Sequence, residues 1–341
     1  MKALLIGGTG TISMSISKKL IADGHELYLL NRGNRNDVLP KGKVKYITCD
    51  INDEVATQKA LGEHEFDVVA DFIAFTKDHL ERDYRLFKDR ARQFIFISSA
   101  SAYQKPLSSY LITESTPLAN PFWQYSRDKI ECENYLNELY QKEGFPITIV
   151  RPSHTYSERD VPLAVKGNNG SWQVIRRMMD GKPVIVHGDG TSLWTLTHAR
   201  DFAIAFVGLM DNVHAVGETF HITSDESLSW NQIYHTVARV LGVKPKIVHM
   251  SSDLLNDCSD YDFEGELLGD KAHTVVFDNT KVKRAVPEFV CTTRFDQGIK
   301  ETIEFILSHP EHQLVDEEFD AWCDRMILAY ENMTEEMRKL L

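Results

Sequence analysis

Two side chains with complementary proton chemistry, Tyr125 and Lys129, stand four residues apart at the start of a predicted helix. Residues four apart lie on the same face of a helix, so the phenol and the ammonium should be neighbours. The positive charge can lower the phenol pKa from its usual value near ~10. Tyr125 could then exchange a proton with a substrate hydroxyl or carbonyl near neutral pH. This spacing also occurs by chance, so the interpretation needs support from other residues.

A polar strand end earlier in the chain supplies a third candidate. The predicted strand 93–97 runs directly into the stretch 98–103, which is rich in serine. In a parallel sheet the carboxyl ends of the strands face the ligand crevice. Ser99 is therefore expected to hold the reacting oxygen, and the predicted catalytic set is Ser99, Tyr125 and Lys129.

A glycine-rich loop, Gly7-Gly8-Thr9-Gly10-Thr11-Ile12-Ser13, lies between the first predicted strand and the first predicted helix. Glycines let the backbone turn sharply and approach a pyrophosphate, whose charge meets the free N–H groups at the helix N-terminus. Ser13 takes the place of the usual third glycine and is small enough for close packing. The loop predicts a dinucleotide-binding site with these cofactor contacts: Gly7, Thr9, Gly10, Thr11 and Ile12.

The end of the second predicted strand should lie beside the adenosine ribose, where the chain has Asn31, Arg32 and Arg35. An aspartate there would bind the ribose 2′-hydroxyl of NAD, whereas arginines can pair with a 2′-phosphate. The sequence therefore favours NADP, with NAD as the alternative, because arginines are also common in polar surface turns. Asp50 and Ile51, directly after the third strand, are placed to contact the adenine.

Short apolar runs alternate with longer helical stretches through the first half of the chain. Such alternation is typical of parallel strands joined by crossover helices, and runs that are apolar on both faces indicate a doubly covered sheet. The sequence predicts an α/β fold, a Rossmann-type doubly wound parallel sheet with a smaller C-terminal substrate lobe. The expected strands are 2–6, 26–30, 44–48, 67–73, 93–97 and 146–150.

The regular pattern ends near Arg151, where proline and glycine break the chain into shorter pieces. We expect a dinucleotide-binding domain at 1–151, to which some later segments return, and a substrate-binding lobe at 152–310. A helical extension should occupy 311–341, where a stripe of apolar residues is expected to pack on the protein's own body, with a subunit contact as the alternative. The stripe consists of Phe319, Trp322, Met326, Tyr330, Met333 and Met337.

Composition disfavours several functional classes. Of the 341 residues, 43% are hydrophobic and 26% are charged, which is typical of a globular protein, and the net charge is −12. That sign disfavours nucleic acid or an anionic membrane as the main partner, and no apolar run is long enough for a membrane span. Five widely separated cysteines lack metal-ligand spacing, so we expect reduced thiols, no metal site and a cytoplasmic location.

Taken together, these motifs resemble the extended short-chain dehydrogenase/reductase superfamily, in its NAD-dependent epimerase/dehydratase branch. The resemblance runs from residue 1 to about residue 310. It includes the glycine loop, the strand end at Ser99, Tyr125 with Lys129, Arg151-Pro152-Ser153, and Gly188-Asp189-Gly190 followed by Asp201.

The resemblance implies roles for individual residues. Ser99, Tyr125 and Lys129 take the catalytic positions, with Lys129 also anchoring the cofactor ribose. Six further residues should line the cofactor, the last three beside the nicotinamide: Phe72, Ile73, Ala74, Pro152, Ser153 and His154. The candidate substrate contacts are Phe75, Ser99, His154 and Trp194.

The chain departs from the family pattern at three places. Family dehydratases carry an Asp-Glu pair immediately after the catalytic hydroxyl residue, where this chain has Ala100-Ser101, so sugar dehydration is disfavoured. Nucleotide-sugar enzymes commonly hold the substrate diphosphate with an arginine at the place occupied here by Trp194. The usual asparagine after Arg-Pro-x is His154. A substrate smaller than a nucleotide sugar is therefore expected.

The sequence as a whole predicts an NAD(P)-dependent oxidoreductase or epimerase that acts on an alcohol or carbonyl carbon of a small polar, sugar-like substrate. Two alternatives stay open: a nucleotide-sugar epimerase, and a non-catalytic dinucleotide sensor or RNA-associated member of the same superfamily. The presence of Tyr125 and Lys129 and the negative net charge disfavour the second alternative. The expected partner is a small molecule, not nucleic acid or a membrane, and a homodimer stays open.

Overall fold

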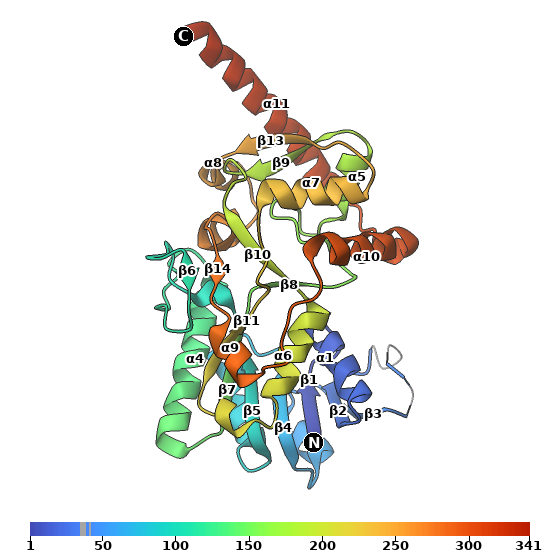
Figure 1. Ribbon diagram of the computed structural model, residues 1–341, viewed down its shortest axis with the longest axis vertical. Coiled ribbons are helices and arrows are strands. Elements are labelled where there is room, and N and C mark those ends of the chain that lie inside the picture. Colours follow the sequence, from blue (N-terminus) through green and yellow to red (C-terminus); the bar gives the residue numbers. More distant parts are fainter. Residues whose placement is uncertain (35–38, 41) are drawn as a thin grey trace.

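A seven-stranded sheet forms the centre of the fold, and each hydrogen-bonded pair of its strands is parallel (Figure 1). The order is β11-β7-β5-β4-β1-β2-β3, so the winding direction reverses between β1 and β4. Ligands of such sheets bind beyond the carboxyl ends of the strands at the reversal. The computed structural model describes residues 1–34, 39–40 and 42–341. The strands of this sheet are β1 (Lys2–Ile6), β2 (Glu26–Asn31), β3 (Val44–Thr48), β4 (Phe66–Asp71), β5 (Ala91–Ile97), β7 (Ile147–Pro152) and β11 (Thr219–Ile222).

Helices cover both faces of this sheet (Figure 1). Ala3 and Leu5 of β1 belong to the core under α1, α6 and α9, whereas Leu4 and Ile6 belong to the core under α2, α3 and α4. Burial on both sides explains why β1 is apolar from Ala3 to Ile6. The helices are α1 (Thr11–Ala22), α2 (Glu54–Leu61), α3 (Lys77–Phe87), α4 (Gln124–Glu143), α6 (Ala199–Leu209) and α9 (Thr280–Ala285).

Helix α4 positions two of the predicted catalytic side chains. Cys132, Leu136 and Leu139 form its apolar stripe against the sheet, and Lys129 lies one turn earlier on the same stripe. Lys129 is therefore only 3% exposed. The helix ends at Gly144, whose left-handed conformation (φ 70°) carries no steric cost for glycine.

A second lobe is built on three small sheets around its own hydrophobic core. The largest of these sheets joins β8 (His154–Tyr156), β10 (Leu193–His198) and β12 (Ser227–Ser229), and the other two are strand pairs. Three later elements, α6, β11 and α9, pack with the large sheet instead. The remaining elements are β6 (Leu111–Ile112), β9 (Pro183–His187), β13 (Lys246–Met250), β14 (Val276–Phe277), α5 (Trp172–Met179), α7 (Trp230–Val240), α8 (Ser252–Asp257), a π-helical segment (Glu264–Lys271), α10 (Phe295–Ser308) and four short or terminal helices, η1 (Ala100–Ala102), η2 (Val213–Ala215), η4 (Pro310–His312) and α11 (Glu317–Leu340).

The predicted fold class, α/β with a Rossmann-type doubly wound parallel sheet, is confirmed. All six predicted strands are present, and their ends differ from the prediction by at most two residues. The sequence does not predict β11, a strand of four residues that joins the sheet through its pairing with β7. The lobe boundaries at 151 and 310 stay a prediction.

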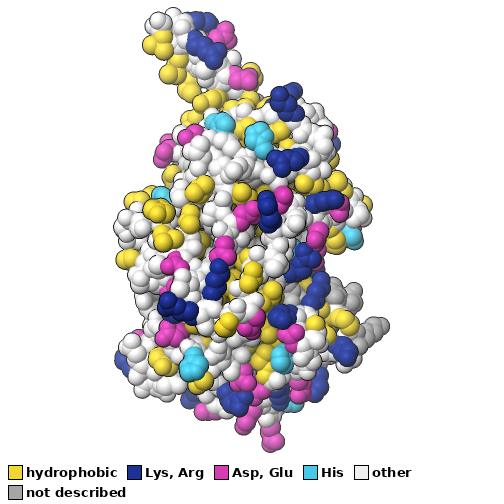
Figure 2. Space-filling view, in the orientation of Figure 1, with side chains coloured by type: hydrophobic (Ala, Val, Ile, Leu, Met, Phe, Trp, Pro, Cys, Tyr) yellow, Lys and Arg dark blue, Asp and Glu magenta, His cyan; other side chains and the backbone are white. Residues whose placement is uncertain are grey.

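Helix α11 continues beyond the body of the protein (Figure 1). Its first half is buried, with Phe319, Trp322 and Met326 in the core of the second lobe. Met333 and Met337, further along, are 45% and 55% exposed, and apolar side chains show on the projecting end in Figure 2. The apolar stripe is thus covered only in part. Within the described part of the chain, no helix is both long and apolar enough to cross a membrane.

Candidate active site

Ser99 and Tyr125 meet at the wall of a cavity of about 320 Å³. Ser99 follows the carboxyl end of β5, Tyr125 lies in the first turn of α4, and both side chains line this cavity. A ligand in this cavity would therefore contact both Tyr125, the predicted proton donor, and Ser99, which is predicted to bind the reacting oxygen. Its lining consists of Ser99, Ala100, Ser101, Trp123, Tyr125, Pro152, Ser153, His154, Lys166, Trp194, Glu266, Asp270 and Lys271.

Lys129 lies behind this wall and is fixed by the backbone. Its Nζ donates to the carbonyl oxygens of Ala74 and Ile97, both at 2.7 Å, and lies 5.7 Å from the centroid of the Tyr125 ring. An ammonium has three N–H bonds, so one remains for a ligand. Burial lowers the pKa of Lys129 to about 8, because the charged form is poorly solvated there.

The pKa of Tyr125 differs from the expectation that Lys129 would lower it. Burial raises the pKa of the phenol, the hydrogen bond with Ser99 opposes that effect, and the charge of Asp270 adds to it. The ammonium of Lys129 does not outweigh burial, so the net shift is upward. In this state Tyr125 is a neutral proton donor at neutral pH.

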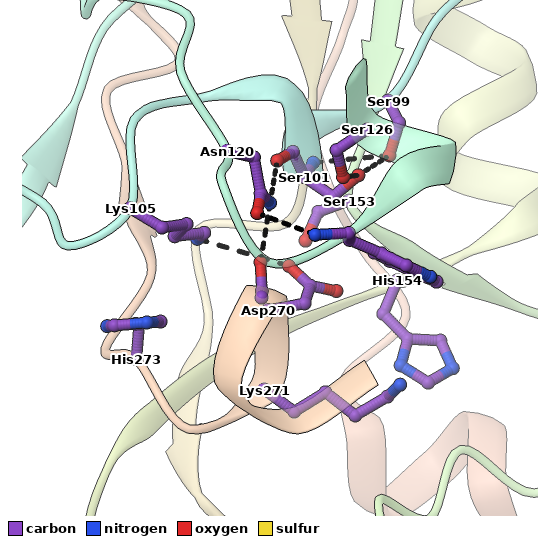
Figure 3. A network of polar contacts seen from close by, with 12 residues as sticks. Ser99, Ser101, Lys105, Asn120, Ser126, Ser153, His154, Asp270, Lys271 and His273 are labelled. Atoms are coloured by element: carbon purple, nitrogen blue, oxygen red, sulfur yellow. Dashed lines mark hydrogen bonds and ion pairs between the residues drawn. The ribbon is translucent and has the colours of Figure 1, made fainter. Parts of the chain in front are cut away.

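Ser99 is held by a network of polar contacts (Figure 3). The Ser101 N–H donates to Ser99 Oγ at 3.1 Å, and Ser126 Oγ donates to Ser101 Oγ at 2.8 Å. Asn120 donates its side-chain amide to the carbonyl oxygens of Ser101 (2.8 Å) and of Gly269 (2.7 Å), which belongs to the π-helical segment. The strand end that carries Ser99 is therefore tied to the second lobe.

The glycine loop is held by two serine hydroxyls of α1. Ser13 Oγ donates to the Gly7 carbonyl at 2.8 Å and accepts from the Gly10 N–H at 2.9 Å, while Ser17 Oγ donates to the Gly8 carbonyl at 2.8 Å. Gly7 has φ 80°, and a Cβ there would lie 2.5 Å from a neighbouring side-chain atom. Position 7 thus requires glycine. Ser13, at the place of the usual third glycine, not only is small enough to fit but also holds the loop through its hydroxyl.

A second cavity, of about 480 Å³, lies over the glycine loop and the ends of β2 and β3. It brings together eight of the predicted cofactor residues: Gly7, Thr9, Gly10, Asn31, Arg32, Asp50, Ile51 and Ile73. Arg82 also lines this cavity and was not predicted from the sequence. The cavity's position beyond the strand ends is the one expected for a dinucleotide.

Asn31 gives a direct test of whether this cavity suits a dinucleotide. Its Oδ1 accepts the Gly33 N–H at 2.9 Å, whereas its buried Nδ2 has no hydrogen-bond partner in the described part of the chain. An unpaired buried donor is costly unless a ligand satisfies it, and a ribose or phosphate oxygen would do so. Arg32 is exposed at the same wall, and Arg35 lies outside the described residues. The residues that line this cavity therefore fit a dinucleotide.

Thr11, Ile12 and Phe72 are among the predicted cofactor residues that do not line this cavity. Thr11 and Ile12 form the first turn of α1, where the backbone N–H groups of a helix have no intrahelical partner. Phe72 packs its ring against Phe206, with centroids 5.5 Å apart, in the core between α6 and the sheet. The structure thus brings Phe72 to the sheet core instead of the cavity wall.

The segment after β4 links the two cavities. Ile73 lines the larger cavity, the Ala74 carbonyl accepts from Lys129, and the ring of Phe75 lies 6.4 Å from that of Tyr125. Asp71 Oδ1 shapes this segment by accepting the backbone N–H groups of Ile73 and Ala74. Pro152 and Ser153 lie at the smaller cavity.

Trp194 and His154 act as a pair at the smaller cavity. Trp194 is 2% exposed and packs its ring 5.3 Å from that of Trp230, so it is mainly a core side chain. Its indole N–H donates to His154 Nδ1 at 3.3 Å. Burial lowers the pKa of His154 to about 3, and the charges of Lys271 and Lys166 act in the same direction.

Several polar residues at the cavity were not predicted from the sequence. Lys166, Glu266, Asp270 and Lys271 come from the second lobe, far from Tyr125 in the chain. Lys105 is fully buried, with its Nζ 3.9 Å from Asp270 Oδ1 and no hydrogen-bond partner in the part of the chain that is described. No local spacing marks these residues as a group, because only the tertiary fold brings them together.

Known proteins that resemble this chain include a reductase and a stem-loop binding protein. The chain is 25% identical over 245 residues to 2′-dehydrokanamycin reductase of Streptomyces kanamyceticus, which covers 71% of this chain and 67% of that protein. It is 27% identical over 261 residues to the chloroplast stem-loop binding protein of 41 kDa b of Arabidopsis thaliana, which covers 73% and 65%. The matches therefore span about two thirds of the length of these curated relatives.

Solved structures share the fold at low sequence identity. An epimerase from Methanothermobacter thermautotrophicus matches with a TM-score of 0.72 at 16% identity, covering 91% of this chain and 93% of that one. UDP-glucuronic acid 4-epimerase from Bacillus cereus, in complex with UDP-glucuronic acid and NAD, matches with a TM-score of 0.71 at 18% identity, covering 90% and 99%.

A family model matches the part of the chain that contains the glycine loop and the candidate catalytic residues. The model described as the NAD dependent epimerase/dehydratase family matches residues 3–223, well over half of the chain. This range contains the glycine loop, Ser99, Tyr125 and Lys129. The chain therefore belongs to the NAD dependent epimerase/dehydratase family.

Proposed function

We propose that this protein is an NAD(P)-dependent oxidoreductase or epimerase that acts on an alcohol or carbonyl carbon of a small polar, sugar-like substrate. The observation that carries the proposal is the meeting of Ser99 and Tyr125 at one cavity wall, with Lys129 fixed behind them. Membership of the family supports the use of a nicotinamide dinucleotide, and the cavity supports the presence of a substrate site beside it.

Each member of the set has a distinct task in this proposal. Tyr125 passes its phenolic proton to the substrate oxygen, or takes the proton back in the reverse direction. Ser99 holds that oxygen through its hydroxyl, which the Ser101 N–H orients. Lys129 would hold the cofactor ribose with its remaining N–H, and it keeps a positive charge near the phenol. Hydride exchange at the substrate carbon is the chemistry that a nicotinamide dinucleotide supplies when bound.

NADP is the cofactor that the end of β2 supports. Asn31 offers an unpaired amide donor without the negative charge of an aspartate, and Arg32 is exposed beside it. Both features favour a 2′-phosphate over a bare 2′-hydroxyl. NAD is the alternative, and it is the dinucleotide in the complex of the Bacillus cereus enzyme.

The size of the smaller cavity supports a compact substrate. A volume of about 320 Å³ lies at the lower end of the usual range for small-molecule sites, and the second lobe closes it with charged side chains. A sugar or sugar derivative fits such a space better than a nucleotide sugar does. The expected partner is thus a small molecule, and we further propose a cytoplasmic location, to which the five unpaired cysteines are suited.

The cofactor that the purified protein retains tests this proposal. Mass spectrometry of the released small molecules, followed by titration with NADPH and NADH, should show a bound dinucleotide with Kd in the micromolar range or below. Exchangeable NADP would indicate a reductase, whereas tightly held NAD would indicate internal redox epimerisation. Failure of both dinucleotides to bind would remove the proposal.

A second candidate function follows from one relative. The chloroplast stem-loop binding protein, 27% identical over 261 residues, makes RNA binding on the same fold an alternative. The net charge of −12 disfavours it, because phosphate neutralisation needs clustered cations. A gel-shift titration with an RNA stem-loop at physiological salt separates the two, since tight and salt-dependent binding would favour the RNA function.

A further inference from the structure

Three side chains with nitrogen donors, His154, Lys166 and Lys271, line the smaller cavity together with the carboxylates of Glu266 and Asp270. We propose that His154, Lys166 and Lys271 form a subsite for a single anionic group, a carboxylate or a phosphate, on the sugar-like substrate. The inference rests on the proposed function for the reacting end of that substrate, and it specifies the class: a sugar acid or a sugar phosphate.

His154 is a neutral donor of fixed orientation. Its Nδ1 accepts the indole N–H of Trp194 at 3.3 Å, so the ring carries its proton on Nε2. Burial, with Lys271 and Lys166 nearby, lowers the pKa of His154 to about 3, which keeps the ring uncharged at neutral pH. A neutral imidazole at this place donates a hydrogen bond without adding a buried charge of its own.

The side chain of Lys271 is held with its ammonium directed toward His154. Only 6% of the residue is exposed, and its Nζ donates to Glu266 Oε2 at 2.8 Å and to the Glu266 carbonyl at 3.4 Å. In Figure 3 its side chain runs toward the ring of His154. Two of its three N–H bonds are thus directed to Glu266, and the third is available to a ligand.

Lys166 adds a second positive charge, and its ion-pair partner, Asp160, competes only weakly with a ligand for it. Its Nζ lies 3.1 Å from Asp160 Oδ2, but the Asp160 side chain is 48% exposed and that of Lys166 is 23% exposed. Water screens an exposed carboxylate, so it neutralises the lysine only in part. Burial is the largest cause of the lowered pKa of His154; the charges of Lys271 and Lys166 act in the same direction, and the charge of Asp160 opposes them.

Both carboxylates that line the cavity already have cationic partners. Glu266 Oε2 pairs with Lys271 Nζ at 2.8 Å, and Asp270 Oδ1 lies 3.9 Å from Lys105 Nζ. The charge of Asp270 acts on Tyr125, at the reacting end of the cavity. We therefore expect the anion at the His154 end, where His154, Lys166 and Lys271 have N–H donors, and uncharged hydroxyl or carbonyl groups at the Tyr125 end.

Binding of matched charged and neutral probes to the full-length protein tests the subsite. Calorimetry would compare D-glucuronate with D-glucuronamide, and D-glucose 6-phosphate with D-glucose, with and without saturating NADPH. We expect at least one anion to bind about tenfold or more tightly than its neutral counterpart, with the difference shrinking as salt rises. The two arms identify carboxylate or phosphate as the group. Equal affinity within both pairs, or no binding of either anion, would overturn the proposal.

Two variants and a matched control assign the effect to this wall. Lys271→Met and Lys166→Met should each remove most of the anion's advantage and leave the neutral probe unchanged, whereas Lys300→Met, at an exposed position, should not. If Lys271→Met does not fold because Glu266 has lost its partner, Lys166→Met alone tests the proposal. An anion preference that survives in Lys166→Met and in every folded Lys271→Met preparation would contradict the assignment. Failure of the proposed function would appear as an absence of dinucleotide binding. Failure of the subsite would appear in the anion titrations without cofactor, so the two failures are distinguishable.

Discussion

The ammonium of Lys129 lies 5.7 Å from the centroid of the Tyr125 ring, and two of its N–H bonds point to backbone carbonyls instead of the phenol. Lys129 is therefore fixed in place before any ligand binds, with one donor left over. Its pKa of about 8 puts the loss of that charge within an accessible pH range.

Dinucleotide affinity should decline as pH rises through about 8, because Lys129 loses its proton and with it the charge and the free donor. Lys129→Met should bind NADPH more weakly at pH 7 and should lose this pH dependence. Fluorescence titration from pH 6.5 to 9.5 measures both effects, with Lys142→Met, an exposed lysine of the same helix, as control. A pH profile that is unchanged in Lys129→Met would exclude Lys129 as the titrating group.

The glycine loop should depend on the Ser13 hydroxyl. Ser13→Ala leaves the Gly10 N–H without its partner and removes one of the two donors to the Gly7 carbonyl, which also accepts the Thr9 N–H at 2.9 Å. The loss should lower the free energy of unfolding by about 1–3 kcal/mol and weaken dinucleotide binding. Urea unfolding and NADPH titration measure the two effects. Ser15→Ala, at a half-buried position of the same helix, is the control and should change little. Equal behaviour of the two variants would show that the Ser13 bonds are not important.

Cofactor choice should depend on Arg32 and Arg35, because only the 2′-phosphate distinguishes the two dinucleotides. Replacing both with glutamine should weaken NADP by roughly tenfold or more, since charge-assisted hydrogen bonds contribute about 1.5–3 kcal/mol each, and should spare NAD. Parallel titrations of both cofactors measure this, with Arg176→Gln as an exposed control. Equal losses for NADP and NAD would remove the arginines from the specificity.

Stability should fall as pH rises because of a buried carboxyl behind the Ile73 segment. Burial and the charge of Asp71 raise the pKa of Asp83 well above its ordinary value, while Arg82 opposes that shift. Above about pH 4 the unfolded chain has lost this proton and the native state has kept it, so unfolding becomes easier with rising pH until Asp83 ionises.

The substitution Asp83→Asn should remove that slope. It keeps an oxygen that can accept from Arg82 and adds a donor toward Asp71 Oδ2, which has no hydrogen-bond partner within the described residues. Urea unfolding across pH 5 to 8 should therefore give a flatter profile than wild type, whereas Asp89→Asn, at an exposed site, should follow wild type. A wild-type slope in Asp83→Asn would contradict the assignment.

The sheet and the dinucleotide loop could be predicted from the sequence because their signals are local. Strand β1, the glycines and the first turn of α1 follow one another directly, and Tyr125 and Lys129 share one helix. Lys271 is different, since it reaches the cavity from a lobe that only tertiary packing places there. The upward pKa shift of Tyr125 also escapes the sequence, because it depends on how deeply the phenol is buried.

The role of Tyr125 as proton donor is the central claim, and its most direct test is turnover by Tyr125→Phe. Oxidation of NADPH with a panel of sugar carbonyl compounds would identify a substrate for wild type, and the same assay would then be applied to the variant and to Tyr140→Phe, a control on the same helix. Loss of the general acid should lower turnover about 100-fold or more while NADPH binding stays nearly intact. A Tyr125→Phe variant that keeps more than about a third of wild-type turnover would contradict the account.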